Sequence, residues 1–383
     1  MTTSVLVLGA GFGGLELSAR LAEELGDRVR ITLVDQADSF VFGFTKLDLM
    51  FGRRTADGVR LRYRDIASPH VRFVRETITS IDAPARRVVT DVQTHEADIL
   101  VIALGADYDL AATPGLAEAG NEFYSVAGAE RLREPVSAFT SGTAIVGICG
   151  APFKCPPAPS EAALLLDDHL RTRGVRDRVR IQVVMPFGQP IPPSPETSRV
   201  ILARFAERDI EFIPDRRVAA LDPKTHEAVL DDGRRLPFDL FLGVPVHVAP
   251  AVVRSSGLTE KGWIPVEPRT AATRHPDVYA LGDVTSVGTP KAGVFAERAA
   301  RAMADQLIAR IRGAAVPPGY DGTGACYIEL GRNEVGRVDV DFFSTPGRPT
   351  GTFTAPSADT AGEKAEFGAS RAARWFGPGV GLR

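Results

Sequence analysis

The residue with the clearest chemical potential is Cys155, which stands in a proline-rich turn after an apolar stretch at residues 144–148. The turn leads into a helical pattern that ends near Leu170. A thiolate is the nucleophilic form of cysteine, and both a helix N-terminus and the neighbouring Lys154 favour the thiolate over the thiol. We therefore expect Cys155 to be a reactive thiol. The alternative is a buried, inert cysteine, because free cysteine is among the most buried residue types.

A glycine-rich turn near the start of the chain predicts nucleotide binding. Gly9, Gly11 and Gly14 have the GxGxxG spacing between an apolar strand and an amphipathic helix. This spacing allows a tight turn and lets backbone N–H groups approach a pyrophosphate at the helix N-terminus. Asp35 ends the next strand, where a carboxylate can accept hydrogen bonds from ribose hydroxyls. The strand, turn, helix and acid together predict a dinucleotide site.

Two later segments return the chain to this first unit. Residues 98–107 form an apolar strand that ends at Gly105, and a further strand leads to Gly282 and Asp283 before a long helical pattern that starts around Lys291. Together with the glycine turn, these segments resemble the FAD-binding half of the pyridine nucleotide-disulphide oxidoreductase superfamily. The resemblance implies that Asp283 reaches the ribityl chain of FAD. It also implies a catalytic role for Lys291, which would face the flavin edge that becomes anionic on reduction.

The resemblance assigns a set of residues to the cofactor, FAD. These expected contacts come from the glycine turn, the ends of strands and the start of the last long helix: Gly9, Ala10, Gly11, Phe12, Gly13, Gly14, Asp35, Gln36, Ile78, Ala103, Gly105, Gly282, Asp283, Lys291, Ala292 and Gly293. No metal site is expected, because none of the three cysteines has CxxC spacing.

The middle of the chain repeats the strand, turn and helix without the second glycine loop that an NADH site needs. Only Gly147 and Gly150 remain of the glycines, Phe153 is bulky, and the next strand, VRIQVVMP, ends without an acid. Tight NADH binding is therefore not expected. The CxxxxC pair of the disulfide reductases is also missing, because Cys149 and Cys155 have the wrong spacing and lie in the wrong domain.

A short C-terminal unit narrows the resemblance. Residues 325–343 predict a β-hairpin that contains Cys326, and the chain resembles the sulfide:quinone oxidoreductase and flavocytochrome c sulfide dehydrogenase family over essentially its whole length. That family places one cysteine in a proline-rich turn and another in a C-terminal strand, as Cys155 and Cys326 stand here. The resemblance implies a redox pair beside FAD that oxidises sulfide or a small thiol and passes electrons to a quinone or protein acceptor. Whether Cys149 takes part stays open.

The predicted fold class is α/β, with two Rossmann-like dinucleotide-binding domains of the three-layer ββα type and a small C-terminal β-hairpin and helix unit. The FAD-binding domain is expected to be discontinuous, at residues 1–113 and 270–316. The second domain, with a degenerate NADH site and Cys155, is expected at residues 114–269. The C-terminal domain with Cys326 is expected at residues 317–383.

Composition excludes several function classes. The 383 residues carry a net charge of −3 with 24% charged residues, which gives no basic field for nucleic acid. The chain enters its first strand directly and has no apolar run of membrane-spanning length, so we expect a cytoplasmic protein. A peripheral contact with the inner membrane face and a homodimer are left open.

The last helical pattern, residues 361–376, bears on that membrane contact. Lys364, Arg371 and Arg374 surround an alanine-rich face that ends at Phe376. A basic amphipathic helix can lie on an anionic membrane and let the site draw quinone from it. Packing on the protein's own body is the favoured alternative, because alanine offers little apolar area.

Other candidates and function classes stay open. Phe342, Phe343 and Phe353 could stack a quinone ring, although hairpin aromatics are more often core, and His247 in its loop is more often structural than catalytic. Beside the sulfide or thiol oxidoreductase, the alternatives are an NAD(P)H-dependent quinone or protein reductase, similar to type II NADH dehydrogenases, and a non-catalytic flavin-binding protein. Dispensable cysteines would indicate the last of these.

Overall fold

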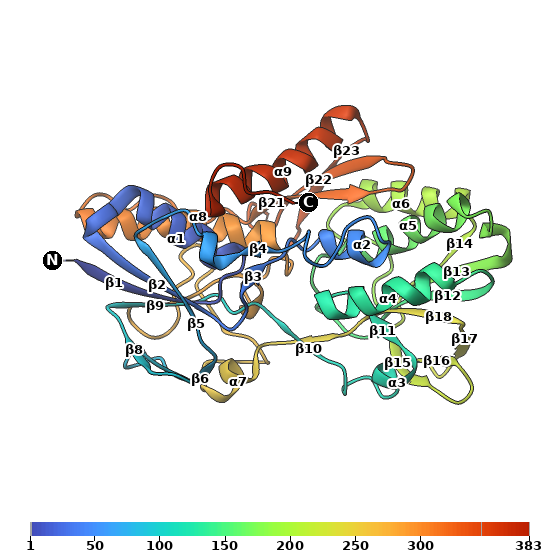
Figure 1. Ribbon diagram of the computed structural model, residues 1–383, viewed down its shortest axis with the longest axis horizontal. Helices are drawn as coiled ribbons and strands as arrows, with labels where there is room; N and C mark the ends of the chain where they lie inside the picture. Colours follow the sequence, from blue (N-terminus) through green and yellow to red (C-terminus); the bar gives the residue numbers. More distant parts are fainter. Residues whose placement is uncertain (1, 346, 383) are drawn as a thin grey trace.

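The computed structural model describes residues 2–345 and 347–382, and the chain forms two α/β lobes with the C-terminal segment lying across both (Figure 1). Each lobe has a parallel sheet, a layer of helices on one face and a small antiparallel sheet on the other. This arrangement confirms the predicted fold class.

The first lobe is built on a five-stranded parallel sheet in the order β20-β9-β1-β2-β5. Val5 and Val7 face the helices while Leu6 and Leu8 face the other side, so β1 is apolar along its buried length. The strands are β1 (Thr3–Leu8), β2 (Val29–Asp35), β5 (Val71–Arg75), β9 (Ile99–Ile102) and β20 (Val278–Ala280). One face is covered by α1 (Phe12–Leu25) and α8 (Gly293–Arg312), the other by β6 (Ile78–Asp82), β7 (Arg87–Thr90), β8 (Thr94–Glu96) and α7 (Ala251–Ser255).

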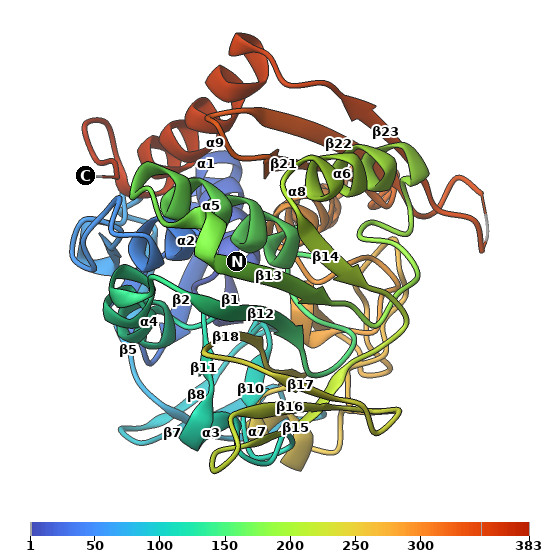
Figure 2. The ribbon, with the colours of Figure 1, turned by 90° about the vertical axis from the view of Figure 1, so that its right-hand side faces the viewer.

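The second lobe repeats this plan with a five-stranded parallel sheet in the order β11-β18-β12-β13-β14. In Figure 2, α5 and α6 lie above this sheet and β15 to β17 lie below it. The strands are β11 (Asn121–Glu122), β12 (Gly142–Ile148), β13 (Val179–Val184), β14 (Ile210–Ile213) and β18 (Leu240–Val244). The covering elements are α3 (Leu116–Ala119), α4 (Val126–Ala138), α5 (Ala158–Thr172), α6 (Pro195–Glu207), β15 (Val218–Asp222), β16 (Glu227–Leu230) and β17 (Arg235–Pro237).

A pair of antiparallel strands, β10 (Asp107–Asp109) and β19 (Val246–Val248), joins the lobes. After β19 the chain rejoins the first core, where Ala249, Val253 and Ile264 are buried. The chain therefore returns to the first lobe before residue 269, where we predicted the end of the second domain. These apolar residues complete the outer layer of the first sheet. The remaining short elements are β3 (Ser39–Phe40), α2 (Thr45–Met50), β4 (Leu61–Arg62) and the 3-10 helices η1 (Gly26–Arg28), η2 (Tyr63–Asp65), η3 (Arg176–Arg178) and η4 (Gly282–Val284).

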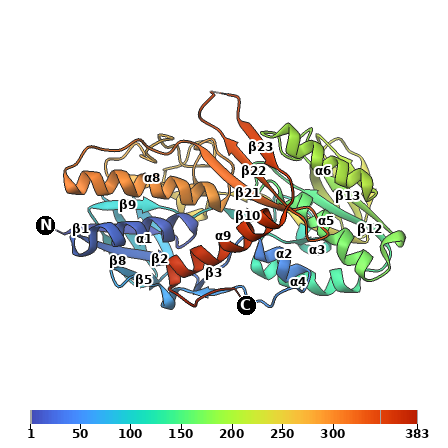
Figure 3. The ribbon, with the colours of Figure 1, turned by 90° about the horizontal axis from the view of Figure 1, so that it is seen from above.

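The C-terminal segment connects the two lobes. An antiparallel sheet of β21 (Thr323–Glu329), β22 (Val335–Asp341) and β23 (Thr350–Thr354) precedes α9 (Ala358–Phe376). β21 packs against α5 of the second lobe and α8 of the first. Figure 3 shows α9 running back from this sheet towards α1 of the first lobe.

α9 packs on the body of the protein, as the favoured alternative expected. Trp375 and Phe376 are buried in the first core. Its three predicted basic residues each pair with an acid of the same chain, as Lys364–Glu329, Arg371–Glu297 and Arg374–Glu16. Among the described residues, no helix combines the length and the apolar character needed to cross a membrane.

Trp375→Ala should destabilise the protein strongly. The side chain is 2% exposed, and its indole N–H donates to the buried carboxylate of Glu16 at 2.8 Å. Loss of a buried aromatic ring of this size costs about 3–5 kcal/mol. Urea unfolding followed by circular dichroism measures the change, with Val316→Ala at a 60% exposed position as the control. A loss below about 1 kcal/mol would contradict the packing of α9 on the first lobe.

Candidate active site

A cavity of about 530 Å³ opens at the carboxyl ends of the first sheet and extends to Cys155 of the second lobe. The carboxyl edge of a parallel sheet is the usual place for a dinucleotide. Most of the predicted cofactor residues line this cavity, namely Gly9, Gly11, Phe12, Gly13, Asp35, Ala103, Gly105, Gly282, Asp283, Ala292 and Gly293.

The glycines of the first turn have different roles. An added Cβ on Gly9, which has φ +98°, would lie 2.4 Å from the carbonyl oxygen of Ala103, and one on Gly14 would lie 1.9 Å from that of Gly9. At these two positions the absence of a side chain allows close packing of the backbone. Close packing explains the glycines without requiring that both contact a ligand. A Cβ on Gly11 would meet nothing within 4 Å, so the backbone there faces open space along the cavity. An approaching pyrophosphate requires this openness.

Asp35 holds the turn and faces the cavity from the end of β2. One carboxylate oxygen accepts the N–H of Ala10 and the other accepts that of Ala37, both at 2.8 Å. Burial raises the pKa of this carboxyl group in spite of those bonds, and a ribose hydroxyl would add a further donor. Ala10 supports the turn through its carbonyl oxygen, which accepts the hydroxyl of Tyr63 at 2.8 Å. The turn, the acid and the cavity fit a dinucleotide.

Two predicted cofactor contacts lie away from the cavity. Gln36 is exposed beyond β2, and its carbonyl oxygen accepts Nε of Arg75 at 3.2 Å. Ile78 lies in β6 and packs against the core beneath the first sheet. Neither residue lines the cavity, although Gln36 lies between Asp35 and Ala37, which do, and both contacts stay predictions.

Lys291 supports the site from behind and does not line the cavity. Its ammonium group donates to the carbonyl oxygens of Asp283 at 2.6 Å and Thr285 at 3.1 Å, and lies 3.3 Å from the ring centre of Trp263. Burial lowers its pKa to about 8. Its carbonyl oxygen accepts the N–H of Cys155 at 2.8 Å. In the structure the ammonium group holds the η4 turn, and the predicted catalytic role at the flavin edge stays a prediction.

Two other lysines bring positive charge to the cavity. Lys46 donates to the carbonyl oxygen of Tyr124 at 2.5 Å, and Lys154 donates to that of Ala106 at 2.8 Å. Burial raises the pKa of Asp283, and both lysines lower it. Sequence reasoning missed Lys46, because a single lysine in a short helix carries no signal of such a place.

His247 is buried beside the same end of the cavity. Its Nδ1 lies 2.8 Å from the carbonyl oxygen of Pro245, and its ring packs edge-on against Tyr108 and Tyr124. Burial lowers its pKa to about 3, so the ring is neutral. Within the described part of the chain, His247 Nε2 and the buried Tyr124 hydroxyl lack hydrogen-bond partners. Tyr124 lines the cavity, where a ligand with a polar edge would supply one.

Cys155 lines the cavity at the turn before α5, with φ +50°. Burial raises the pKa of its thiol well above the ordinary value, and Glu161 and Cys326 raise it further. The start of the following helix and Lys46 lower the pKa, but burial outweighs both. Burial thus opposes the predicted thiolate beside Lys154, and the reactivity of Cys155 stays a prediction. The Lys154 ammonium group is bound elsewhere, and burial penalises the charged form of the thiol.

A buried carboxyl group lies beside both thiols. Glu161 is in the first turn of α5, lines the cavity and accepts the N–H of Glu329 at 2.9 Å. Burial raises its pKa to about 7. Cys326 lies in β21 opposite Val338, and burial followed by the charge of Glu161 raises its pKa to about 12. Cys155, Cys326 and Glu161 thus form one electrostatically coupled cluster. Sequence reasoning missed Glu161, whose only signal was its place one turn after the proline-rich segment.

Cys149 belongs to a different part of the second lobe. Val146 and Ile148 face the helices, whereas Ile145 and Cys149 face the antiparallel sheet. Burial raises the pKa of Cys149 to about 12. Its thiol therefore lies on the opposite side of the parallel sheet from the cluster.

The place where the second lobe would hold a dinucleotide is filled by side chains. Phe153 is buried and stacks on Phe187, which follows β13, with ring centres 6.0 Å apart. A Cβ on Gly147 would lie 2.5 Å from the ring of Phe241, so this glycine serves packing within the lobe. The aromatic stack occupies the carboxyl ends of β12 and β13, the edge at which a nucleotide would bind.

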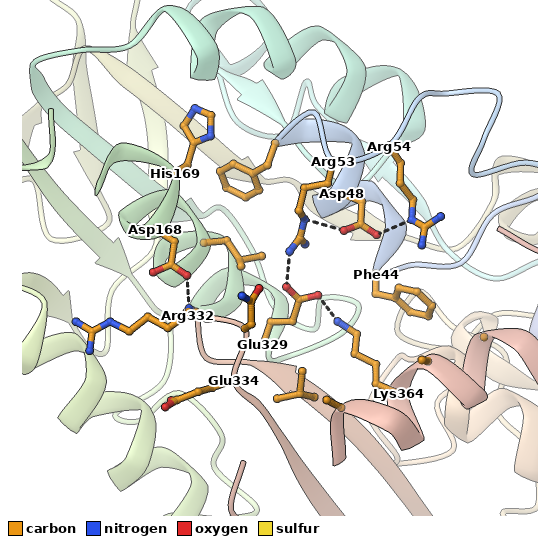
Figure 4. A pocket seen from close by; sticks show the side chains of 18 of the residues that line it. Phe44, Asp48, Arg53, Arg54, Asp168, His169, Glu329, Arg332, Glu334 and Lys364 are labelled. Carbon is orange, nitrogen blue, oxygen red and sulfur yellow. Dashed lines mark hydrogen bonds and ion pairs between the residues drawn. The ribbon is translucent and has the colours of Figure 1, made fainter. Parts of the chain in front are cut away.

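A larger cavity, the outer cavity, has a volume of about 1000 Å³ and lies between α2, α5, α9 and the β21–β22 turn (Figure 4). Arg53 binds Asp48 and Glu329, each at 2.8 Å, and Lys364 also binds Glu329. Arg54 lies 3.4 Å from Asp48. These three cations share two carboxylates, which leaves positive charge in excess on this wall. Sequence reasoning missed the outer cavity because its residues come from distant segments.

The sequence matches the family model described as pyridine nucleotide-disulphide oxidoreductase over residues 3–304. It is 24% identical over 359 residues to the mitochondrial sulfide:quinone oxidoreductase of Mus musculus, a match that covers 89% of this chain and 79% of that protein. It is also 24% identical over 310 residues to the type II NADH:quinone oxidoreductase of Staphylococcus haemolyticus, with 74% of each chain covered.

Solved structures support the same fold. The sulfide:quinone oxidoreductase of Aquifex aeolicus superposes with a TM-score of 0.84 at 22% identity, covering 96% of this chain and 90% of that one. NDH2 of Plasmodium falciparum in complex with NADH superposes with a TM-score of 0.75 at 11% identity, covering 96% and 94%. At these identities the likeness concerns the fold.

Glu161→Gln should make the two thiols of the cluster easier to alkylate. The neutral amide removes a charge that raises the pKa of Cys155 and Cys326, so the iodoacetamide rate near about pH 8 should rise roughly threefold to tenfold. Mass spectrometry of the two cysteine peptides measures the rate. Glu366→Gln, at an exposed position on α9, is the control. Equal rates in Glu161→Gln and the unchanged protein would refute the coupling.

Proposed function

The chain belongs to the pyridine nucleotide-disulphide oxidoreductase family, and from this premise we propose that it oxidises sulfide or a small thiol through Cys155 and Cys326, with a quinone or a protein as electron acceptor. It is an FAD-dependent oxidoreductase. The observation that supports the proposal most directly is that Cys155 and Glu161 line one end of the dinucleotide cavity, with Cys326 near enough for its charge to act on Cys155.

FAD, when bound, supplies the redox chemistry by accepting an electron pair from the thiol pair and returning it to the acceptor. The residues that would hold FAD are those of the cavity. Gly11 and the N-terminus of α1 suit its pyrophosphate, and Asp35 suits its ribose. Asp283 and Gly293 line the part of the cavity nearer to the cysteines and suit its flavin half.

Sulfide enters the oxidised cysteine pair by attack on the Cys326 sulfur. A new S–S bond gives a persulfide on Cys326, the Cys155–Cys326 bond breaks, and Cys155 leaves as a thiolate. We assign the thiolate to Cys155 because this residue lines the FAD cavity, whereas Cys326 lies behind it in β21. Glu161, with its pKa raised to about 7, takes the proton that hydrogen sulfide releases.

The outer cavity offers a route for a second sulfur compound. A thiolate R–S⁻ attacks the outer sulfur of the persulfide, forms R–S–SH and releases Cys326 as a thiolate, so that both cysteines are ready for reoxidation. Glu329 separates the outer cavity from the cluster, since its side chain lies in the cavity and its N–H binds Glu161. The excess positive charge beside Arg53 and Arg54 favours an anionic thiol.

A third cavity, of about 690 Å³, lies between α8, β21 and α9, and we assign the quinone to its aromatic side, although most of the lining residues are charged. Tyr327 and Phe367 line it with ring centres 6.1 Å apart. The first turn of α8 separates it from the FAD cavity, because Val294 lines the third cavity and Gly293 lines the other. The hairpin aromatics pack against the core, as the favoured alternative expected: Phe342, Phe343 and Phe353.

The second candidate function is that of an NAD(P)H-dependent quinone or protein reductase. The likeness to type II NADH:quinone oxidoreductases favours it. The stack of Phe153 on Phe187 opposes it, because these rings fill the edge where a nicotinamide dinucleotide would bind. The third candidate is a non-catalytic flavin-binding protein, in which the cysteines would be dispensable for function.

Sulfide, and not NADH, should bleach the flavin absorbance of the purified protein under anaerobic conditions. Cys155→Ser and Cys326→Ser should each slow the bleaching by at least about 100-fold, because neither can form the disulfide that sulfide attacks. Cys149→Ser, on the opposite face of the sheet, should retain it. Bleaching by NADH alone would establish the NAD(P)H-dependent reductase. No response to either compound would favour the non-catalytic flavin-binding protein.

Mercaptosuccinate should accept sulfur better than mercaptoethanol at equal thiolate concentration. Its two carboxylates can pair with the excess cations of the outer cavity, whereas mercaptoethanol has no charge apart from the thiolate. Arg54→Gln should lower kcat/KM for mercaptosuccinate by roughly fivefold to tenfold and leave that for mercaptoethanol unchanged. Persulfide product formation measures both rates. Equal losses for the two thiols would place the second sulfur compound elsewhere.

A further inference from the structure

We propose that Arg208, Asp168 and the turn between β21 and β22 form a buried clamp that positions Cys326 opposite Cys155. The proposal rests on the cysteine pair of the proposed function, but it requires neither a particular sulfur donor nor a particular electron acceptor. Arg208 and Asp168 touch no reacting atom and act through the strand that carries Cys326.

The clamp is one arginine and one acid that hold both sides of the turn. Arg208, directly after α6, is 0% exposed, and its guanidinium donates to Asp168 at 3.0 Å and to the carbonyl oxygen of Leu330 at 2.9 Å. The second carboxylate oxygen of Asp168 accepts the backbone N–H of Arg332, a contact that Figure 4 draws. The turn is therefore attached to α6 through Arg208 and to α5 through Asp168.

The backbone of the turn has a conformation that side chains normally oppose. Gly331, Arg332 and Asn333 have φ of +76°, +52° and +58°. Left-handed backbone costs roughly 1–2 kcal/mol for a residue with a side chain, and such turns persist where their surroundings fix them. An added Cβ on Gly331 would lie 2.2 Å from Nη1 of Arg208. The turn and the guanidinium therefore fit against one another without spare room.

The clamp reaches the cysteines through α5 and β21. Glu161 and Asp168 are two helical turns apart and so lie on one side of α5. Glu161 accepts the N–H of Glu329 at the end of β21, and Asp168 accepts that of Arg332 just beyond it. The strand that carries Cys326 is thus fixed at two points along the helix that follows Cys155. Because both thiols are attached to this contact, a loosened turn lets β21 move along α5.

Burial of Arg208 is better explained by positioning than by stability, and its partner Asp168 is 25% exposed at the wall of the outer cavity. A buried ion pair contributes little net stability compared with apolar packing, but its directional bonds select one geometry. A second pair on the same turn, Arg204 with Glu334 at 2.7 Å, is partly exposed and joins the turn to α6 only. Exposed pairs of this kind contribute about 0–1 kcal/mol. Arg204 therefore provides a matched control.

Arg208→Met should weaken the Cys155–Cys326 disulfide, because methionine keeps the apolar stem and removes both donors. The purified flavoprotein is equilibrated in glutathione redox buffers, and the free thiols are trapped and identified by mass spectrometry. The equilibrium constant for the disulfide should fall at least about tenfold, which moves the reduction potential by about 30 mV towards easier reduction. Arg204→Gln should keep the potential of the unchanged protein, and Arg208→Lys should restore part of the loss.

Gly331→Ala provides a second test that leaves Arg208 in place, and it carries the experiment if Arg208→Met does not fold. Bound FAD per chain and the thermal midpoint report folding of each variant. An unchanged potential in Arg208→Met or Gly331→Ala, or an equal shift in Arg204→Gln, would overturn the clamp alone. If the unchanged protein forms no Cys155–Cys326 disulfide in any buffer, the cysteine pair and the clamp both fail.

Discussion

Two partly buried thiols and a buried carboxyl group interact electrostatically, and the site depends on how many negative charges these three groups can carry together. Burial raises the pKa of Cys155, Cys326 and Glu161, and the charge of Glu161 raises that of both thiols. Groups coupled in this way titrate as a unit, so one negative charge disfavours the next. A thiolate therefore forms most readily when Glu161 holds a proton. This constraint links bond breaking at the cysteines to proton transfer at the carboxyl group.

The site exists only because three parts of the chain meet. The first lobe provides the dinucleotide cavity, the second provides Cys155, and the C-terminal segment provides Cys326. β21 packs on both α5 and α8, and α9 returns to the first lobe, where Trp375 binds the buried Glu16 at 2.8 Å. The C-terminal segment is thus tied to both lobes. Its packing therefore sets where Cys326 lies relative to both lobes.

The two lobes share a plan but differ at one turn, which follows β1 in the first lobe and β12 in the second. In the first lobe, Gly9 and Gly11 leave the backbone open to a ligand. In the second, Phe153 fills the corresponding edge, and Cys155 follows with its N–H bound to the carbonyl oxygen of Lys291. The filled turn has no room for a nicotinamide, and its backbone holds the Cys155 thiol in place. The hydrogen bond from the Cys155 N–H to the Lys291 carbonyl oxygen also connects this turn to Asp283, because the Lys291 ammonium group binds the Asp283 carbonyl oxygen.

The sequence by itself determined the two lobes and the glycine turn with Asp35. These features depend on local periodicity and on short motifs, which survive without knowledge of distant contacts. Only the tertiary structure decided that Lys291 binds the η4 turn and that Glu161 lies beside the cysteines. It also decided that burial raises the pKa of both thiols and that an outer cavity lies on the other side of Glu329. Burial, pKa and the shape of a cavity are sums over segments far apart in the chain, and no local pattern records which segments meet.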